Sequence, residues 1–171
     1  MGLFFSNIQI RRTENELDFA QIAAVLTEGR DLSAVDNEEE ADIALSVFTV
    51  ADSPWITVCS DLIEGDFEEL GAKARRLSET LQTQTLALAC LDSDYFCMNL
   101  IDAANGADLW AANGRMTEGK APRRSSLAPW KRYVSDIEAF KRTMRGKYVF
   151  AEACLDGLEP LLSLPVLQGE A

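Results

Sequence analysis

Apolar residues follow two different periods along the first two thirds of the chain. Alternation between apolar and polar positions, or a short apolar run bounded by turn residues, is typical of β-strands. Stretches of this kind occupy residues 3–12, 43–47, 55–60, 85–91, 95–101 and 107–112. Residues 13–29 and 66–81 instead place apolar side chains three or four positions apart, which predicts two amphipathic helices. The expected order is β-α-β-β-α-β-β, followed by a further short strand.

The two helical stretches begin at capping residues. Thr13 and Glu16 have the spacing of a capping box, and Asp66 and Glu69 supply a cap and an acidic residue for the first turn. The second helix has the clearer pattern, and Lys73 lies off its apolar stripe. That stripe, which we expect in the core, consists of Phe67, Leu70, Ala74, Leu77 and Leu81.

The last third of the chain is predicted to be a loop followed by two helices. Residues 113–129 combine Gly, Pro, Ser and Arg without periodicity, which indicates an exposed loop. A third helix is predicted to start at Ser135, and a fourth to run over about 147–162. Helical spacing would place Val149 and Phe150 of the fourth helix in the core.

These elements predict an α+β fold. Hairpins outnumber crossover connections, so the sheet should be mainly antiparallel, with two C-terminal helices packed on it. The first six elements also have the order of a ferredoxin-like split βαβ core, which other two-layer topologies share. We expect one globular domain over residues 1–171, with a sheet core in 3–112, a basic loop in 113–133 and helices in 134–164.

The chain contains no histidine. Histidine is the commonest general base near neutral pH and the commonest metal ligand, so its absence excludes His-based catalytic triads, Cys–His pairs and His-ligated metal sites. The glycines never fall in a GxGxxG or GxxxxGK[ST] arrangement, so there is no recognisable phosphate-binding loop. We therefore expect no cofactor and no metal, lean towards a protein that is not an enzyme, and assign no catalytic residue.

The four cysteines each lie inside an apolar run. Free cysteine is among the most buried residue types, so reduced core thiols in a cytoplasmic protein are the favoured interpretation. If residues 92–95 close a two-residue hairpin loop, Cys90 and Cys97 would face each other and could form a disulfide. No apolar run approaches the ~20 residues that a membrane-spanning helix needs, so no membrane segment is expected.

Charge is distributed unevenly along the chain. Its 28 acidic and 16 basic residues give a formal net charge of −12. Residues 1–113 carry 21 acidic and 6 basic residues, whereas residues 114–147 carry 3 and 10. The basic segment could fold back on the acidic face. Alternatively, the acidic face binds a basic partner, whose association electrostatic steering would accelerate.

The densest acidic run is the first candidate binding site. It is either a solvated loop or a surface for a basic protein partner, and direct binding to nucleic acid is not expected of a protein this acidic. The run consists of Asp36, Glu38, Glu39, Glu40 and Asp42.

A second candidate site combines cations with aromatic rings, which together can hold an anionic ligand or a stacked base. It is otherwise a solvated loop anchored by Trp130. Its residues are Trp110, Arg115, Arg123, Arg124 and Trp130.

Two functions therefore remain open at this point. The first is a non-enzymatic intracellular protein-binding module whose acidic surface engages a basic protein, in its most concrete form an inhibitor or immunity-type protein. The alternative is a small anionic ligand-binding domain, or an enzyme, that uses the basic loop 113–133 and the cleft beside it.

Overall fold

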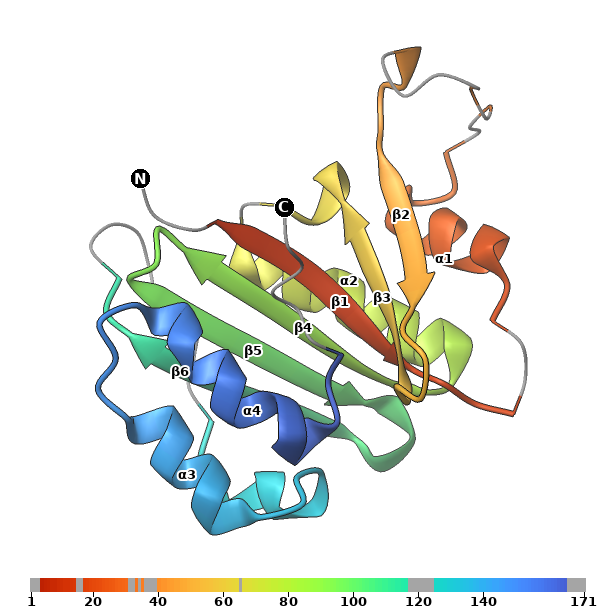
Figure 1. Ribbon diagram of the computed structural model, residues 1–171. Helices are drawn as coiled ribbons and strands as arrows, with labels where there is room; N and C mark the ends of the chain where they lie inside the picture. The colour runs from red at the N-terminus through yellow and green to blue at the C-terminus, as the bar shows by residue number, and fades with distance from the viewer. Residues whose placement is uncertain are drawn as a thin grey trace.

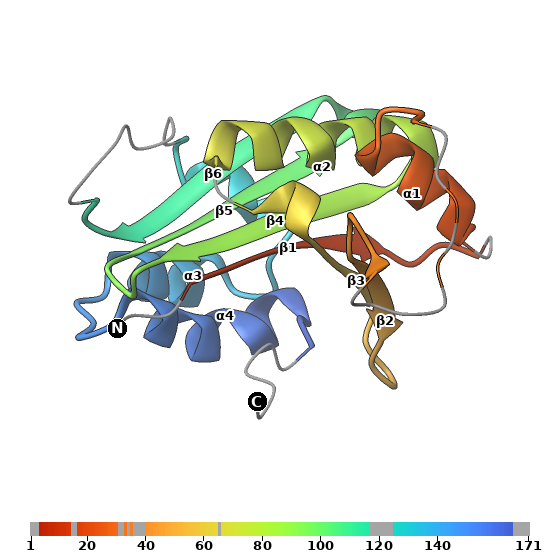
Figure 2. The same ribbon diagram turned by 90° about the horizontal axis from the view of Figure 1, so that it is seen from above.

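The computed structural model describes residues 4–14, 17–30, 33, 35, 40–64, 66–116 and 125–165. A six-stranded antiparallel sheet carries helices on both faces, so the predicted α+β class is confirmed. Figures 1 and 2 show α1 and α2 on one face of the sheet and α3 and α4 on the other. The elements are β1 (Phe5–Arg11), α1 (Phe19–Leu26), β2 (Leu45–Thr49), β3 (Trp55–Ser60), α2 (Phe67–Leu81), β4 (Gln84–Leu91), β5 (Tyr95–Asp102), β6 (Ala107–Gly114), α3 (Ile137–Arg145) and α4 (Leu155–Leu162).

The strand order is β2-β3-β1-β4-β5-β6, and every neighbouring pair is antiparallel. Strands β1 and β2 are therefore parallel to each other with β3 between them, and β3 and β4 are parallel with β1 between them. This is the split βαβ arrangement expected from the element order. Strands β5 and β6 extend the sheet beyond β4.

Strand alternation divides the core into two layers. Ile8 and Ile10 of β1 point towards α2, whose buried stripe includes Leu70 and Leu77 as predicted. Leu86 of β4, like Leu88, Phe96 and Met98, points to the other face and packs under α3 and α4. Among the described residues, no helix has the length and apolar character required to cross a membrane.

Two helices begin at an aspartate rather than at the predicted capping residue. The carboxylate of Asp18 accepts a hydrogen bond from the Ala20 N–H at 2.9 Å, so the N-cap of α1 lies five residues after Thr13. Asp136, not Ser135, caps α3 and accepts from the N–H groups of its first turn. Both carboxylates also match the positive end of the helix dipole. The Thr13 capping box was therefore a wrong prediction.

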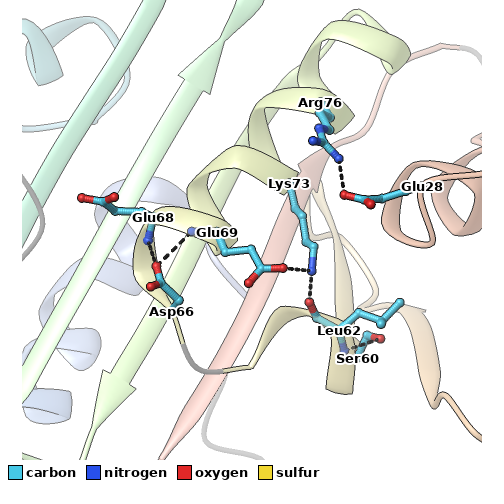
Figure 3. Close-up of polar contacts among 8 residues, drawn as sticks. All are labelled: Glu28, Ser60, Leu62, Asp66, Glu68, Glu69, Lys73 and Arg76. Atoms are coloured by element: carbon cyan, nitrogen blue, oxygen red, sulfur yellow. Dashed lines mark hydrogen bonds and ion pairs between the residues drawn. The ribbon is translucent and has the colours of Figure 1, made fainter.

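Lys73 was expected outside the apolar stripe of α2, but it is buried, with 6% of its surface exposed. Its Nζ donates to the carbonyl oxygen of Leu62 and pairs with Glu69 Oε1 at 2.8 Å (Figure 3). The turn over Asp61–Ile63, which precedes α2, folds back against the helix and covers the lysine. Burial here follows from a tertiary contact that helical spacing does not encode.

The fourth helix starts later than predicted. Residues 147–150 are not helical, a 3₁₀ turn follows over Ala151–Cys154, and α4 begins at Leu155. The Ala151 N–H donates to the carbonyl of Ser93 at 2.6 Å, and Phe150 before it is extended. Val149 and Phe150 consequently lie on the surface, 89% and 57% exposed, and not in the core.

The hairpin between β4 and β5 corrects the predicted pairing of two cysteines. Its loop has three residues, 92–94, so Leu91 is opposite Tyr95, Cys90 is opposite Phe96, and Cys97 is opposite Ala89. This one-residue change of register places Cys90 and Cys97 on opposite faces of the sheet. All four cysteines are free thiols, and all but the half-buried Cys59 are buried.

Candidate functional site

Strand β2 forms one edge of the sheet, and no other described strand pairs with its outer side. It pairs only with β3, from Leu45 opposite Ser60 to Thr49 opposite Ile56. Its sequence, LSVFT, contains neither a charged residue nor a proline, two features that commonly prevent an edge strand from pairing with another chain. Within the described part of the chain, nothing hydrogen-bonds to the outer side of β2. Among the described residues, the backbone groups on this side of β2 are therefore without a strand partner.

The opposite edge of the sheet is different because a neighbouring segment covers it. The Ser125 N–H donates to the carbonyl of Trp110 in the middle of β6 at 3.1 Å, and the Trp110 N–H donates to Ser125 Oγ at 3.0 Å. These two bonds satisfy backbone groups that would otherwise be open on that edge. The contrast makes β2 the accessible edge.

Two hollows lie between α1 and β2, and each is lined by apolar side chains together with an arginine, Arg12 in the first and Arg30 in the second. Helix α1 packs mainly on α2 and stands away from the edge strand (Figure 2). One hollow, of about 530 Å³, is bounded by Leu17, Phe19, Val47 and Ile56. A second, of about 790 Å³, lies on the other side of Phe19 and reaches Leu45. We call these two hollows the α1–β2 groove.

An exposed aromatic ring flanks the edge on each face of the sheet. Phe19 borders the α1–β2 groove and is 53% exposed. Phe48 lies on the opposite face, where it shares a register position with Thr57, and is 47% exposed. Exposed apolar groups gathered beside an open strand are typical of surfaces that bind another chain.

The predicted acidic run leads into this strand. Glu40 and Asp42 are exposed just before β2, whereas Asp36, Glu38 and Glu39 lie outside the described residues. The start of the strand is fixed by Ala44, whose carbonyl accepts from Ser60 Oγ at 2.7 Å. The described members of the run therefore stand beside the groove and the open edge.

The cations of α2 are bound within the protein and do not neutralise these acids. Arg76 pairs with Glu28 at 2.7 Å, and Arg75 pairs with Asp108 at 2.5 Å (Figure 3 shows the first pair). The hydrogen bond and charge of Arg76 lower the pKa of Glu28 below its ordinary value. Lys73 is buried, as described above. Arg12 and Arg30 line the two hollows, however, so the described surroundings of β2 carry basic as well as acidic side chains.

The two tryptophans of the predicted ligand site are not brought together. Trp110 lies half-buried on the α2 face of the sheet, whereas Trp130 is fully buried on the other face and stacks on Phe140 with ring centroids 4.9 Å apart. The sheet separates the two tryptophans, so they line no common cleft, and Trp130 is a core residue. Arg115 is exposed after the end of β6. The other two predicted residues, Arg123 and Arg124, lie outside the described residues.

The described residues also contain no group of three Cys, Asp or Glu side chains placed to hold a metal ion. Burial raises the pKa of Cys90 to about 12, with a further contribution from the nearby Glu152 carboxylate. A thiol with so high a pKa is a poor nucleophile at neutral pH. Burial raises the pKa of the other three thiols as well.

Sequence reasoning missed the two aromatic residues at the open edge. Phe19 fits the spacing of the helix predicted over residues 13–29, but as the first residue of α1 it borders the groove. Phe48 breaks the alternation of Ile43, Leu45 and Val47, and that irregularity was the available signal.

Comparison with known proteins found no matching family model, no matching curated protein and no matching solved structure.

Proposed function

We propose that this protein is an intracellular binding module that engages a basic protein partner at the β2 edge. The open edge strand beside the α1–β2 groove is the observation that carries the proposal. An extended segment of the partner would add a strand to β2, and its backbone would pair with the outer groups of that strand. No other described edge of the sheet offers the same combination.

Groove and charge together define the partner segment. Alternate side chains of an added strand point to opposite faces, so one set would enter the α1–β2 groove and the other would meet Phe48. Glu40 and Asp42, with the rest of the acidic run, favour lysine or arginine in the segment. Exposed charges act chiefly on the association rate and its salt dependence. An inhibitor or immunity-type protein that covers a basic partner inside the cell is the most concrete form of this function.

A defined peptide tests the proposal. The probe is a ten-residue peptide that alternates lysine with valine, and its control replaces each lysine by glutamate. Titration calorimetry should detect only the lysine peptide, and amide hydrogen exchange should slow in β2 on binding. Binding of both peptides alike, or new protection confined to residues outside 45–49, would contradict the proposal.

Two variants separate the contributions of strand and charge. Phe48→Lys places a charge on the open edge and should abolish binding. Replacing Glu38, Glu39 and Glu40 with glutamine should leave the melting temperature nearly unchanged, because exposed charges typically contribute within about ±0.5 kcal/mol each. The same replacement should slow association and flatten its salt dependence. An unchanged association rate at low and high salt would remove the acidic run from the proposed site.

A further inference from the structure

The sequence contains two Asn-Gly pairs, Asn105-Gly106 just before β6 and Asn113-Gly114 at its end. A glycine after an asparagine permits an intramolecular reaction that a side chain at that position hinders, because the glycine nitrogen can approach the side-chain amide. The two pairs are identical as dipeptides. Their surroundings in the fold therefore decide which of them reacts in the native protein.

The first pair is accessible to this reaction. Asn105 and Gly106 are both exposed, in the turn between β5 and β6. The Gly106 N–H makes a long hydrogen bond, at 3.3 Å, to the carbonyl of Ala103, and a Cβ at Gly106 would meet no described atom within 4 Å other than those of its chain neighbours. The exposed Arg132 donates from Nη2 to Oδ1 of Asn105 at 2.7 Å. Its charge would stabilise the negative charge that develops on Oδ1 when a nucleophile attacks Cγ.

The second pair is protected by the fold. Asn113 is 7% exposed, and its Nδ2 donates to the carbonyls of Met144 at 3.1 Å and of Gly146 at 2.9 Å. Loss of this nitrogen would leave both carbonyl oxygens without their donor in a buried place, which is costly. Gly114 is paired with Tyr95 of β5, so its backbone is held in the ladder.

We propose that Asn105 is a site of spontaneous deamidation in the folded protein, whereas Asn113 is preserved. The Gly106 nitrogen attacks Cγ of Asn105, so a bond forms between these atoms and the bond from Cγ to Nδ2 breaks. Nδ2 leaves as ammonia with the proton of the Gly106 N–H, and a succinimide ring remains. Water then opens the ring at either carbonyl and yields aspartate or isoaspartate. Each product carries a negative charge that asparagine lacks.

The new carboxylate would face a buried one. Asp102, 3% exposed, accepts from Asn105 Nδ2 at 2.7 Å and from both Gln84 Nε2 and the Tyr133 hydroxyl at 3.2 Å. Deamidation replaces the nearest donor with a group of the same charge as Asp102, so the two carboxylates repel each other. An ion pair between the new carboxylate and Arg132 would offset little of this, because exposed pairs are weak.

This cluster joins three segments that are far apart in the chain. Gln84 begins β4, Asp102 ends β5, and Tyr133 follows the 3₁₀ turn over Ala128–Arg132. Deamidation of Asn105 should therefore weaken the attachment of that turn to the sheet and lower the stability of the protein. The cluster lies at the end of the strand order opposite to β2, so peptide binding at β2 should be the same before and after conversion. The two proposals are thus tested separately.

Tandem mass spectrometry of the full chain, after incubation in warm, slightly alkaline buffer, tests the assignment. In the folded protein, aspartate and isoaspartate should accumulate at position 105 and not at position 113. In urea both Asn-Gly pairs should convert, because the buried hydrogen bonds of Asn113 are lost. Asn105→Gln keeps an amide on a longer side chain and should prevent the change. Conversion at Asn105 in urea alone would overturn the proposal, as would equal conversion of Asn105 and Asn113 in the folded chain.

A pair of variants tests the consequence. Asn105→Asp reproduces the aspartate product and should lower the melting temperature. Adding Asp102→Asn to this variant exchanges the carboxylate and the amide, which restores a hydrogen bond between the two side chains, and should recover much of the loss. An Asn105→Asp variant as stable as the unchanged chain would refute repulsion at Asp102, and so would a double variant that recovers nothing.

Discussion

The indole N–H of Trp55 on β3 donates to the carbonyl oxygen of Leu162 at 2.9 Å. Leu162 is the last residue of α4, so this bond fastens the C-terminal helix to the third strand, 107 positions earlier in the chain. The guanidinium of Arg11 lies 5.2 Å from the centroid of the Trp55 ring. A buried tryptophan with a satisfied N–H therefore connects the two halves of the fold.

Trp130 gives the matched comparison for a first prediction. It is equally buried, but its Nε1 has no hydrogen-bond partner within the described structure. Trp55→Phe leaves the Leu162 carbonyl unsatisfied, which typically costs about 1–3 kcal/mol in addition to the lost packing. We therefore expect Trp55→Phe to lower the free energy of unfolding by more than Trp130→Phe does. Equal urea midpoints for the two variants would show that the indole bond contributes nothing.

Gly71 is the subject of a second prediction. A Cβ at this position in α2 would lie 2.7 Å from Cζ2 of Trp110 and 2.9 Å from Oδ1 of Asn99. Alanine normally stabilises a helix interior relative to glycine by about 1 kcal/mol. Here Gly71→Ala should destabilise the protein by about 1–3 kcal/mol, because the added methyl group overpacks the contact between α2 and the sheet.

Denaturation of the Gly71→Ala variant measures this loss, and a double-mutant cycle tests its cause. In the background of Trp110→Leu the same substitution should cost less, since the indole ring that meets the methyl group is gone. An identical cost in both backgrounds would place the strain elsewhere.

A third prediction compares the loss of stability when a buried lysine, Lys73, and a more exposed one, Lys141, are replaced by methionine. Lys73→Met keeps an apolar stem but leaves the Leu62 carbonyl and Glu69 without their partner. We expect a loss of about 1–3 kcal/mol, the usual range for an unsatisfied buried acceptor. Lys141→Met removes an i,i+3 pair with the largely exposed Glu138 and should change stability by no more than about 0.5 kcal/mol. Chemical denaturation of both variants would refute this account if their losses were equal.

The buried thiols give a fourth prediction, a dependence of stability on pH. Burial raises the pKa of Cys90 and of Cys154 from 9.0 to about 12, and it raises the pKa of Cys97 as well. Above pH 9 the unfolded chain releases these protons while the folded chain retains them. Stability should therefore be fully present below pH 9 and fall steadily as the pH rises towards 12. Urea midpoints measured over this range should decrease.

Other groups titrate at alkaline pH, so the thiols need their own control. Replacing Cys90, Cys97 and Cys154 with alanine should reduce the decline in the urea midpoint above pH 9. A chromogenic disulfide reagent should also react with close to four thiols in denaturant and with few in the folded protein. An unchanged slope in the alanine variant would assign the alkaline loss to other residues.

Local polarity decided most of the secondary structure. Alternating side chains set the faces of β1 and β3, and the stripe through Leu70, Ala74 and Leu77 set the buried side of α2. Each depends on residues within a few positions of one another, which is the range over which periodicity acts. The element order and the α+β class followed from the same patterns.

Tertiary structure decided which apolar residues are covered. Helical spacing placed Val149 in the core, but the bond from Ala151 to Ser93 holds that segment at the surface. Trp110 and Trp130, near in sequence, are separated by the sheet.

The candidate site likewise combines one feature that the sequence predicts with another that it does not predict. Its acidic charge could be read from the sequence, but the openness of β2 could not. A strand lies at the edge of a sheet when it has a partner strand on one side only. Strand pairing joins segments that are far apart in the chain. Side-chain polarity encodes the local period of an element, whereas exposure depends on long-range packing that no short window of sequence contains.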